Sequence, residues 1–254
     1  DIRTLAVIGP NADNVYNMLG DYTAPQADGT VVTVLDGIRQ KVSKETGVLY
    51  AKGCAVRDSS RTGFKDAIET ARNADAVVMV MGGSSARDFS SEYEETGAAK
   101  VTINQISDME SGEGYDRATL HLMGRQLELL EEISRLGKPV VLVLIKGRPL
   151  LMEGAIQEAE AIVDAWYPGM QGGNAVADVL FGDYNPAGRL TLSVPRSVGQ
   201  LPVYYNTRRK GNRSRYIEEP GTPRYPFGYG LSYTTFSYTD MKVQVTEGSD
   251  DCRV

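Results

Sequence analysis

The chain has 254 residues and a formal net charge of −6, with 41% hydrophobic and 24% charged residues. These values are typical of one globular α/β domain with a short appendage. No run of eighteen apolar residues exists, which excludes a membrane-spanning helix from this sequence. The acidic balance disfavours nucleic-acid binding, and two cysteines with one histidine give neither a disulfide framework nor metal-ligand spacing.

In chain order, short apolar runs predict the strands of a parallel sheet. They are rich in β-branched residues and nearly continuous, which is the pattern of strands covered by helices on both faces. The expected strands are residues 4–9, 47–53, 76–82, 139–147 and 161–167, of which 47–53 is the weakest.

Between these runs the sequence has helical periodicity. The clearest case is 124–138, where four apolar residues recur at spacings of three, namely Leu127, Leu130, Ile133 and Leu136. Further helices are expected within 32–43, 62–74 and 172–188. Strands that alternate with helices predict a three-layer α/β/α sandwich with a mostly parallel, doubly wound sheet.

One interval breaks this alternation, between the strand ending at Gly82 and the helix beginning near Met123. A segment of that length without a periodic pattern is usually functional or disordered. Its part from Ser84 to Asp116 holds eight acidic and two basic residues, so it carries the whole net charge of the chain. It leaves the carboxyl end of a strand, where open α/β sheets bind ligands, and we therefore expect the functional edge here.

Within this interval, Glu113 stands between Gly112 and Gly114 in the stretch SGEGYDR. Two glycines make a helix unfavourable and predict a bent loop. A glutamate on such a loop suits a general acid, provided that a partner surface closes over it and keeps it protonated. Arg117 is expected to pair with Asp116 and fix the loop, and the alternative is that Glu113 is simply an exposed acid.

Two other kinds of site are weaker candidates. A phosphate cradle in VIGPNADN (7–14) or MGGSSARD (81–88) lacks the glycine pattern of a dinucleotide fingerprint or a following helix. A calcium site would need clustered oxygens, and its candidate ligands, which match no EF-hand spacing, are Asp108, Glu110, Glu113 and Asp116. The basic cluster at 208–215 is interpreted as a solvated loop or a contact with a neighbouring domain.

Several motifs in the same order along the chain resemble glycoside hydrolase family 3, the β-glucosidase and β-xylosidase family. They are LAVIGPNAD, SGEGYDR with LHLMGRQLELLEEI, KPVVLVLIKGRPL, AIVDAWYPGMQGGNAVADVLFGDYNPAGRLTLSVP and RYPFGYGLSYTTFSY. The resemblance implies that residues 1–235 are the family's C-terminal α/β sandwich domain. Residues 236–254 would begin a linker or a fibronectin-type domain, and a (β/α)8 barrel would precede the sandwich.

The resemblance also implies an activity and a division of roles. Glu113 resembles the general acid/base of a retaining β-glycosidase, with Glu110 as a rival, and the nucleophilic aspartate belongs to the barrel. Asp88, Arg87 and Arg117 are candidate substrate-binding residues. The implied partners are a β-linked oligosaccharide or glycoside, the barrel and the fibronectin-type domain, with no cofactor or metal.

The same resemblance favours a periplasmic or secreted enzyme and implies that this chain alone is inactive. It leaves open a β-xylosidase specificity in place of β-glucosidase. It also leaves open a non-catalytic sugar-binding or docking module.

Overall fold

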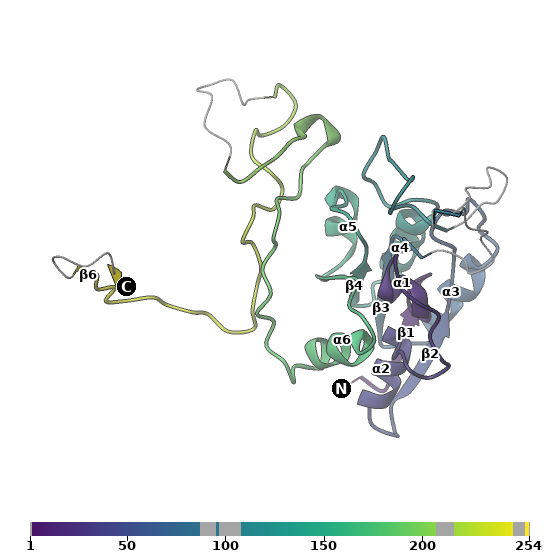
Figure 1. Ribbon diagram of the computed structural model, residues 1–254. Coiled ribbons are helices and arrows are strands. Elements are labelled where there is room, and N and C mark those ends of the chain that lie inside the picture. Colours follow the sequence, from purple (N-terminus) through teal and green to yellow (C-terminus); the bar gives the residue numbers. More distant parts are fainter. Residues whose placement is uncertain (1, 87–94, 97–107, 207–215, 246–251, 254) are drawn as a thin grey trace.

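The computed structural model describes residues 2–86, 95–96, 108–206, 216–245 and 252–253. At its centre is a sheet of five parallel strands in the order β2-β1-β3-β4-β5 (Figure 1). The strands are β1 (Thr4–Ile8), β2 (Gly47–Ala51), β3 (Ala76–Gly82), β4 (Val140–Ile145) and β5 (Ala161–Trp166). All five predicted strands are confirmed, including the weakest.

Six α-helices and one short 3-10 helix occur among the described residues. They are α1 (Val15–Leu19), α2 (Val34–Lys41), α3 (Phe64–Arg72), α4 (Gln126–Ser134), α5 (Glu153–Glu158), α6 (Gly172–Phe181) and η1 (Val198–Gln200). The four predicted helices are confirmed as α2, α3, α4 and α6. Helices α1 and α5 were not predicted, because five or six residues are too few to show a helical period.

Two hydrophobic cores lie on opposite faces of the sheet. Side chains of α1, α2 and α6 pack on one face against strand residues such as Val7 and Val80. Side chains of α3, α4 and α5 pack on the other face against residues such as Ile8 and Met79. Neighbouring residues of one strand therefore enter different cores, which explains the continuous apolar runs and confirms the three-layer sandwich.

The connections after β1 and β3 diverge to opposite faces, although these strands are neighbours. In sheets with this strand order, such a switch point at the carboxyl ends is where ligands bind. Here the strand ends are joined by Asn11, whose Nδ2 donates to Gly83 O at 3.0 Å and Ile145 O at 3.3 Å. A Cβ on Gly9 would lie 2.1 Å from Val80 O. The ends of these strands are therefore packed against one another by the chain's own groups.

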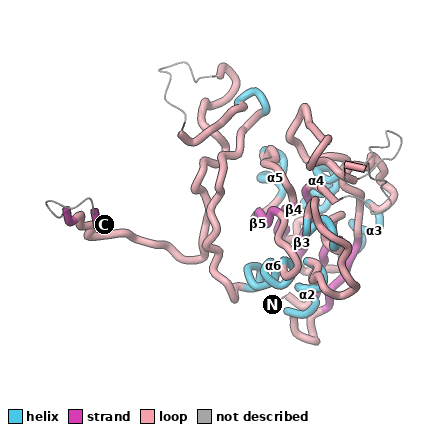
Figure 2. The backbone as a smooth tube through the Cα atoms, viewed as in Figure 1, coloured by secondary structure: helices cyan, strands magenta, loops and turns pink. Residues whose placement is uncertain are grey.

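After α6 the chain changes character and forms extended segments with few contacts to the sandwich (Figure 2). Two of them run antiparallel, with Val194 N donating to Tyr225 O at 2.8 Å and Leu190 N to Tyr229 O at 2.9 Å. Among the described residues of these segments, Leu190, Leu192, Val194 and Tyr225 pack on the core, and Arg196 and Arg224 each lie 3.7 Å from Glu153 of α5. Much of the remaining length stands away from the sandwich (Figure 1).

The described part of the chain ends in a small antiparallel pair, β6 (Gln244–Val245) with β7 (Cys252–Arg253). The basic cluster at 208–215 lies outside the described residues. Among the residues that are described, no helix has both the length and the apolar character needed to cross a membrane.

Candidate active site

Tyr167, the first residue after β5, joins three loops at the carboxyl edge of the sheet. Its ring fills the space beside Gly20, where a Cβ would lie 2.8 Å from Tyr167 Cδ2. Its hydroxyl occupies the space beside Gly147 and forms a 2.9 Å hydrogen bond with Ser111 Oγ. The loops that follow β1, β3 and β4 are therefore packed around one aromatic side chain.

Hydrogen bonds hold the backbone at the start of the SGEG segment in place. The N–H groups of Glu110 and Ser111 both donate to Ser84 O, at 2.8 and 3.2 Å. One residue earlier, Met109 O accepts a 2.8 Å hydrogen bond from Arg57 Nη1. These bonds fix the segment against the residues that follow β2 and β3.

The side chain of Glu110 is almost entirely buried, with 1% of it exposed. Its Oε2 accepts from Arg117 Nη1 at 2.5 Å and lies 3.9 Å from Arg148 Nε. Both guanidinium groups also reach backbone carbonyls of the same loop, Arg148 at Tyr115 O and Arg117 at His121 O. Glu110 is thus hydrogen-bonded to Arg117 and lies near Arg148, and both arginines hold the loop on the carboxyl side of Glu113 through their bonds to its carbonyls.

The pairing of Arg117 with Asp116 was therefore wrong, because Arg117 pairs with Glu110 instead. With 8% of its side chain exposed and both ends of its guanidinium engaged, Arg117 is poorly placed to bind a substrate directly. The other two substrate-binding candidates, Arg87 and Asp88, lie outside the described residues and stay predictions.

Glu113 lies at the tip of this loop and is exposed. The flanking glycines have left-handed backbone angles, with φ of +109° at Gly112 and +81° at Gly114. At Gly112 a Cβ would also lie 2.7 Å from Met109 Cε and 3.1 Å from Asp21 Oδ2. The predicted bent loop is confirmed, and its first glycine is needed both for conformation and for close packing.

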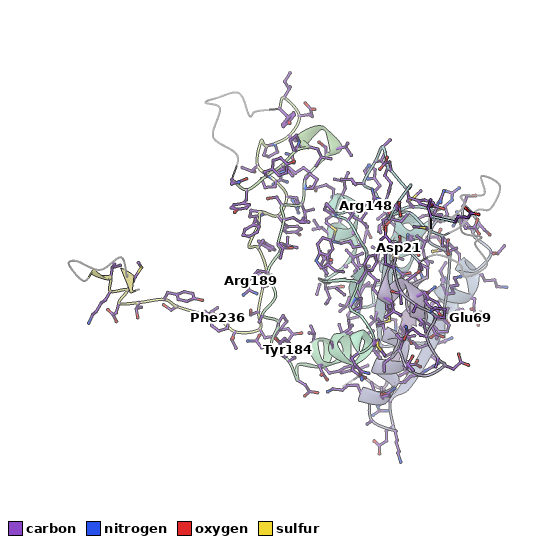
Figure 3. The ribbon with its side chains drawn as sticks, viewed as in Figure 1. Asp21, Glu69, Arg148, Tyr184, Arg189 and Phe236 are labelled. Carbon is purple, nitrogen blue, oxygen red and sulfur yellow. The ribbon has the colours of Figure 1, made fainter. Side chains whose placement is uncertain are left out.

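Tyr22, on the connection that leaves β1, reaches Glu113 from the other side of the switch point. Its hydroxyl donates to Glu113 Oε2 at 2.9 Å. This residue was not predicted, although a tyrosine in the glycine- and proline-containing stretch GDYTAPQADG after the first strand was a visible signal. Arg148 was not predicted either, because its contacts lie far away in the sequence. Asp21 and Arg148 mark these loops in Figure 3.

Three of the four acids considered for calcium have different partners. Asp108 Oδ1 accepts from Arg57 N at 3.2 Å, whereas Glu110 faces the two arginines and Glu113 faces Tyr22. Within the part of the chain that the structure describes, no group of three or more acidic, histidine or cysteine side chains is placed to hold a metal ion.

A second buried charge lies just after β4, at Lys146. Its ammonium is 2.9 Å from Asp164 Oδ2 and 3.7 Å from the centre of the Trp166 ring. Burial lowers the pKa of Lys146, although the carboxylates of Asp164 and Glu110 oppose this effect. Lys146 is also close enough to Glu110 for their charges to attract each other.

The profile of the Glycosyl hydrolase family 3 C-terminal domain matches residues 1–233. The chain belongs to this family. A β-xylosidase of Formosa agariphila is 42% identical over 96% of the chain, and a periplasmic β-glucosidase of Salmonella typhimurium is 38% identical over 94%. The chain spans 32% of the length of each of these relatives, so about two thirds of each lies outside the match.

Solved structures of family 3 enzymes share this fold. A β-glucosidase from Erythrobacter marinus superposes with a TM-score of 0.77 at 36% identity and covers 96% of the chain. A β-glucosidase from Listeria innocua, solved with isofagomine, gives 0.76 at 30% identity over 95%. The chain covers 33% and 31% of these structures, which makes it one α/β sandwich domain of a kind found in larger glycoside hydrolases.

Proposed function

We propose that this chain is the acid/base-bearing domain of a retaining β-glycosidase that removes terminal β-linked sugars from oligosaccharides. The observation that carries the proposal is the position of Glu113. Its carboxylate is exposed at the tip of a loop whose base is anchored by buried ion pairs, at the switch point of the sheet. A carboxylate that is held by rigid structure and still open to a ligand is what proton transfer to a substrate requires.

In the proposed reaction, the nucleophile is an aspartate on an N-terminal (β/α)8 barrel of the same longer protein. The aspartate attacks the anomeric carbon while Glu113 gives its proton to the departing glycosidic oxygen. Glu113 then takes a proton from water, which attacks the glycosyl-enzyme and frees the sugar and the aspartate. The two carboxyl groups must come within about 5–5.5 Å of each other, so the docking of the two domains assembles the site.

The environment of the two glutamates supports Glu113 over Glu110 in this role. Glu110 is buried and paired with Arg117, and a substrate could reach it only if that ion pair opened. Glu113 needs no such rearrangement. Glu110 is instead assigned to holding the loop.

The relatives support two sugar specificities, because they include proteins named β-glucosidase and β-xylosidase. We place β-glucoside hydrolysis first, in line with the β-glucosidase structures that match the chain, and β-xyloside hydrolysis second. A periplasmic or secreted location is proposed from the relative named as periplasmic. The domain boundary at residue 235 and a fibronectin-type domain after it stay predictions.

The test uses the longer enzyme that contains this chain and its upstream barrel, with Glu113→Ala. We expect kcat/KM for cellobiose to fall by about 10²–10⁴-fold, the usual contribution of a general acid. For a dinitrophenyl β-glucoside, whose leaving group departs without a proton, kcat/KM should fall far less. Asp116→Asn, which changes an exposed acid on the same loop, is the matched control and should affect neither substrate. An equal loss on both substrates, or no loss, would contradict the proposal.

A further inference from the structure

Gln126, the first residue of α4, is completely buried beside the carboxyl end of β3. Its Oε1 accepts from Gly82 N at 2.9 Å. Its Nε2 lies 2.9 Å from Gly82 O and 3.1 Å from both Val56 O and Met123 O, so its two N–H groups serve three carbonyls. One side chain therefore joins both ends of the segment between β3 and α4 to the connection that follows β2.

The topology of the sheet explains why an amide is needed at this place. Alternate residues of a strand direct their N–H and C=O groups toward the same neighbour, and Val80 O receives Asn11 N from the connection that follows β1. Gly82 is two residues later and faces the same way, but β1 has ended at Ile8 and its connection leads to the face opposite α4. The amide of Gln126 thus takes the place of a neighbouring strand and satisfies both polar groups of Gly82.

The loop that carries Glu113 is held by residues that lie next to the groups bound by Gln126. Three residues whose hydrogen bonds hold this loop are each within two positions of such a group. In sequence, Ser84 follows Gly82 by two, Arg57 follows Val56 by one, and His121 precedes Met123 by two. A shift of the Gln126 amide would therefore reach the loop on both sides of Glu113.

We propose that Gln126 is a positioning residue for Glu113, which sets the place of the acid/base by holding together the two ends of its loop. The inference rests on the proposed function of Glu113. Gln126 is buried and binds only backbone groups, so it acts through the main chain and not on the substrate. Proton transfer depends steeply on geometry, and a displacement of about 1 Å can lower a rate about 10²-fold.

Two variants of the longer enzyme test this role. Gln126→Met keeps the length of the side chain and removes the amide, whereas Gln126→Glu keeps an oxygen for Gly82 N and removes the donors. Working enzyme is counted with a fluorinated dinitrophenyl β-glucoside, which traps the glycosyl-enzyme and releases one dinitrophenolate per site. Rates are expressed per counted site, so a smaller folded fraction does not affect the result.

For cellobiose, we expect kcat/KM to fall about 10- to 100-fold in both variants, because the glycosidic oxygen leaves only with a proton. For a dinitrophenyl β-glucoside, kcat/KM should stay within about threefold of the native value, since this leaving group needs no proton. Its kcat should still fall about tenfold and its KM with it, because Glu113 is also the base that frees the glycosyl-enzyme. A merely structural role would lower kcat/KM for both substrates alike and would not lower KM.

Gln200→Met is the matched control, because Gln200 is also a buried glutamine that joins two segments of backbone, in the extended part of the chain after α6. Its Oε1 accepts from Arg196 N at 2.7 Å and its Nε2 donates to Pro220 O at 2.9 Å. This variant should leave the ratio of kcat/KM for the two substrates unchanged.

Equal losses on both substrates in the Gln126 variants, or a loss on neither, would overturn the inference, as would an equal change of the ratio in Gln200→Met. If Glu113→Ala still distinguishes the two substrates, such a failure concerns Gln126 alone. If Glu113→Ala has no effect, the proposed function and the positioning role both fail.

Discussion

Glu110 and Glu113 are three residues apart and belong to one acidic loop, yet their surroundings are opposite. Glu110 is enclosed between two arginines at the base of the loop, whereas Glu113 is exposed at its tip beside Tyr22. The base has the features of structural support and the tip has those of a reactive position. Burial thus divides a run of like charges into an anchor at the base of the loop and a reactive group at its tip.

The largest expected effect on stability comes from removing the anchor, with Glu110→Ala. The guanidinium group of Arg117 would then remain buried without its carboxylate, and Arg148 would lose a nearby negative charge. Breaking a buried pair in this way costs about 3–5 kcal/mol. Urea unfolding of the chain, followed by circular dichroism, measures the change in the free energy of unfolding. A loss below about 1 kcal/mol would mean that the arginines find other partners and that Glu110 is not the anchor.

Replacing the two glycines that flank Glu113 should cost different amounts of stability. Gly112→Ala would introduce a left-handed alanine against Met109 and Asp21, and we expect a cost of about 1–3 kcal/mol. At Gly114 no atom lies within 4 Å of the new Cβ, so only the backbone term of roughly 1 kcal/mol remains. Equal losses in the same unfolding assay would show that packing at Gly112 does not matter.

The buried side chain of Lys146, which lies near Glu110, gives a prediction about the pH dependence of stability. Because burial places the folded-state pKa of Lys146 below its ordinary value of 10.5, the unfolded chain binds more protons at this residue between those two values. Stability therefore rises with pH in that window. The free energy of unfolding of the native chain, relative to Lys146→Met, should increase as the pH is raised toward 10.5. A difference that falls over this range would indicate that Asp164 raises the pKa more than burial lowers it.

The smallest effect on stability is expected at the tip, for Glu113→Ala. Since the side chain is exposed, the free energy of unfolding should change by less than about 0.5 kcal/mol, although activity of the longer enzyme is lost. A thermal or urea midpoint clearly below the native one would show that Glu113 contributes to the anchor, and the division between base and tip would fail.

The sequence was sufficient for features that depend on local pattern. Continuous apolar runs identified the five strands, and two glycines identified the bent loop at Glu113. It was not sufficient for contacts between distant segments: Arg148 reaches Glu110 across 38 positions, and Tyr22 reaches Glu113 across 91. Arg117 was assigned to its neighbour Asp116, because a sequence shows proximity along the chain but not which carboxylate is buried with it. Short helices such as α1 were not predicted, because five residues are too few to show a helical period.

The central claim, that Glu113 is the acid/base of a retaining enzyme, is tested most directly by azide rescue. The longer enzyme with Glu113→Ala is given a dinitrophenyl β-glucoside with and without sodium azide, and the products are identified by NMR. We predict that azide, which needs no general base, restores turnover and yields β-glucosyl azide, since it attacks the glycosyl-enzyme from the face that water would use. Slow turnover that azide leaves unchanged, or an α-linked azide, would contradict the account.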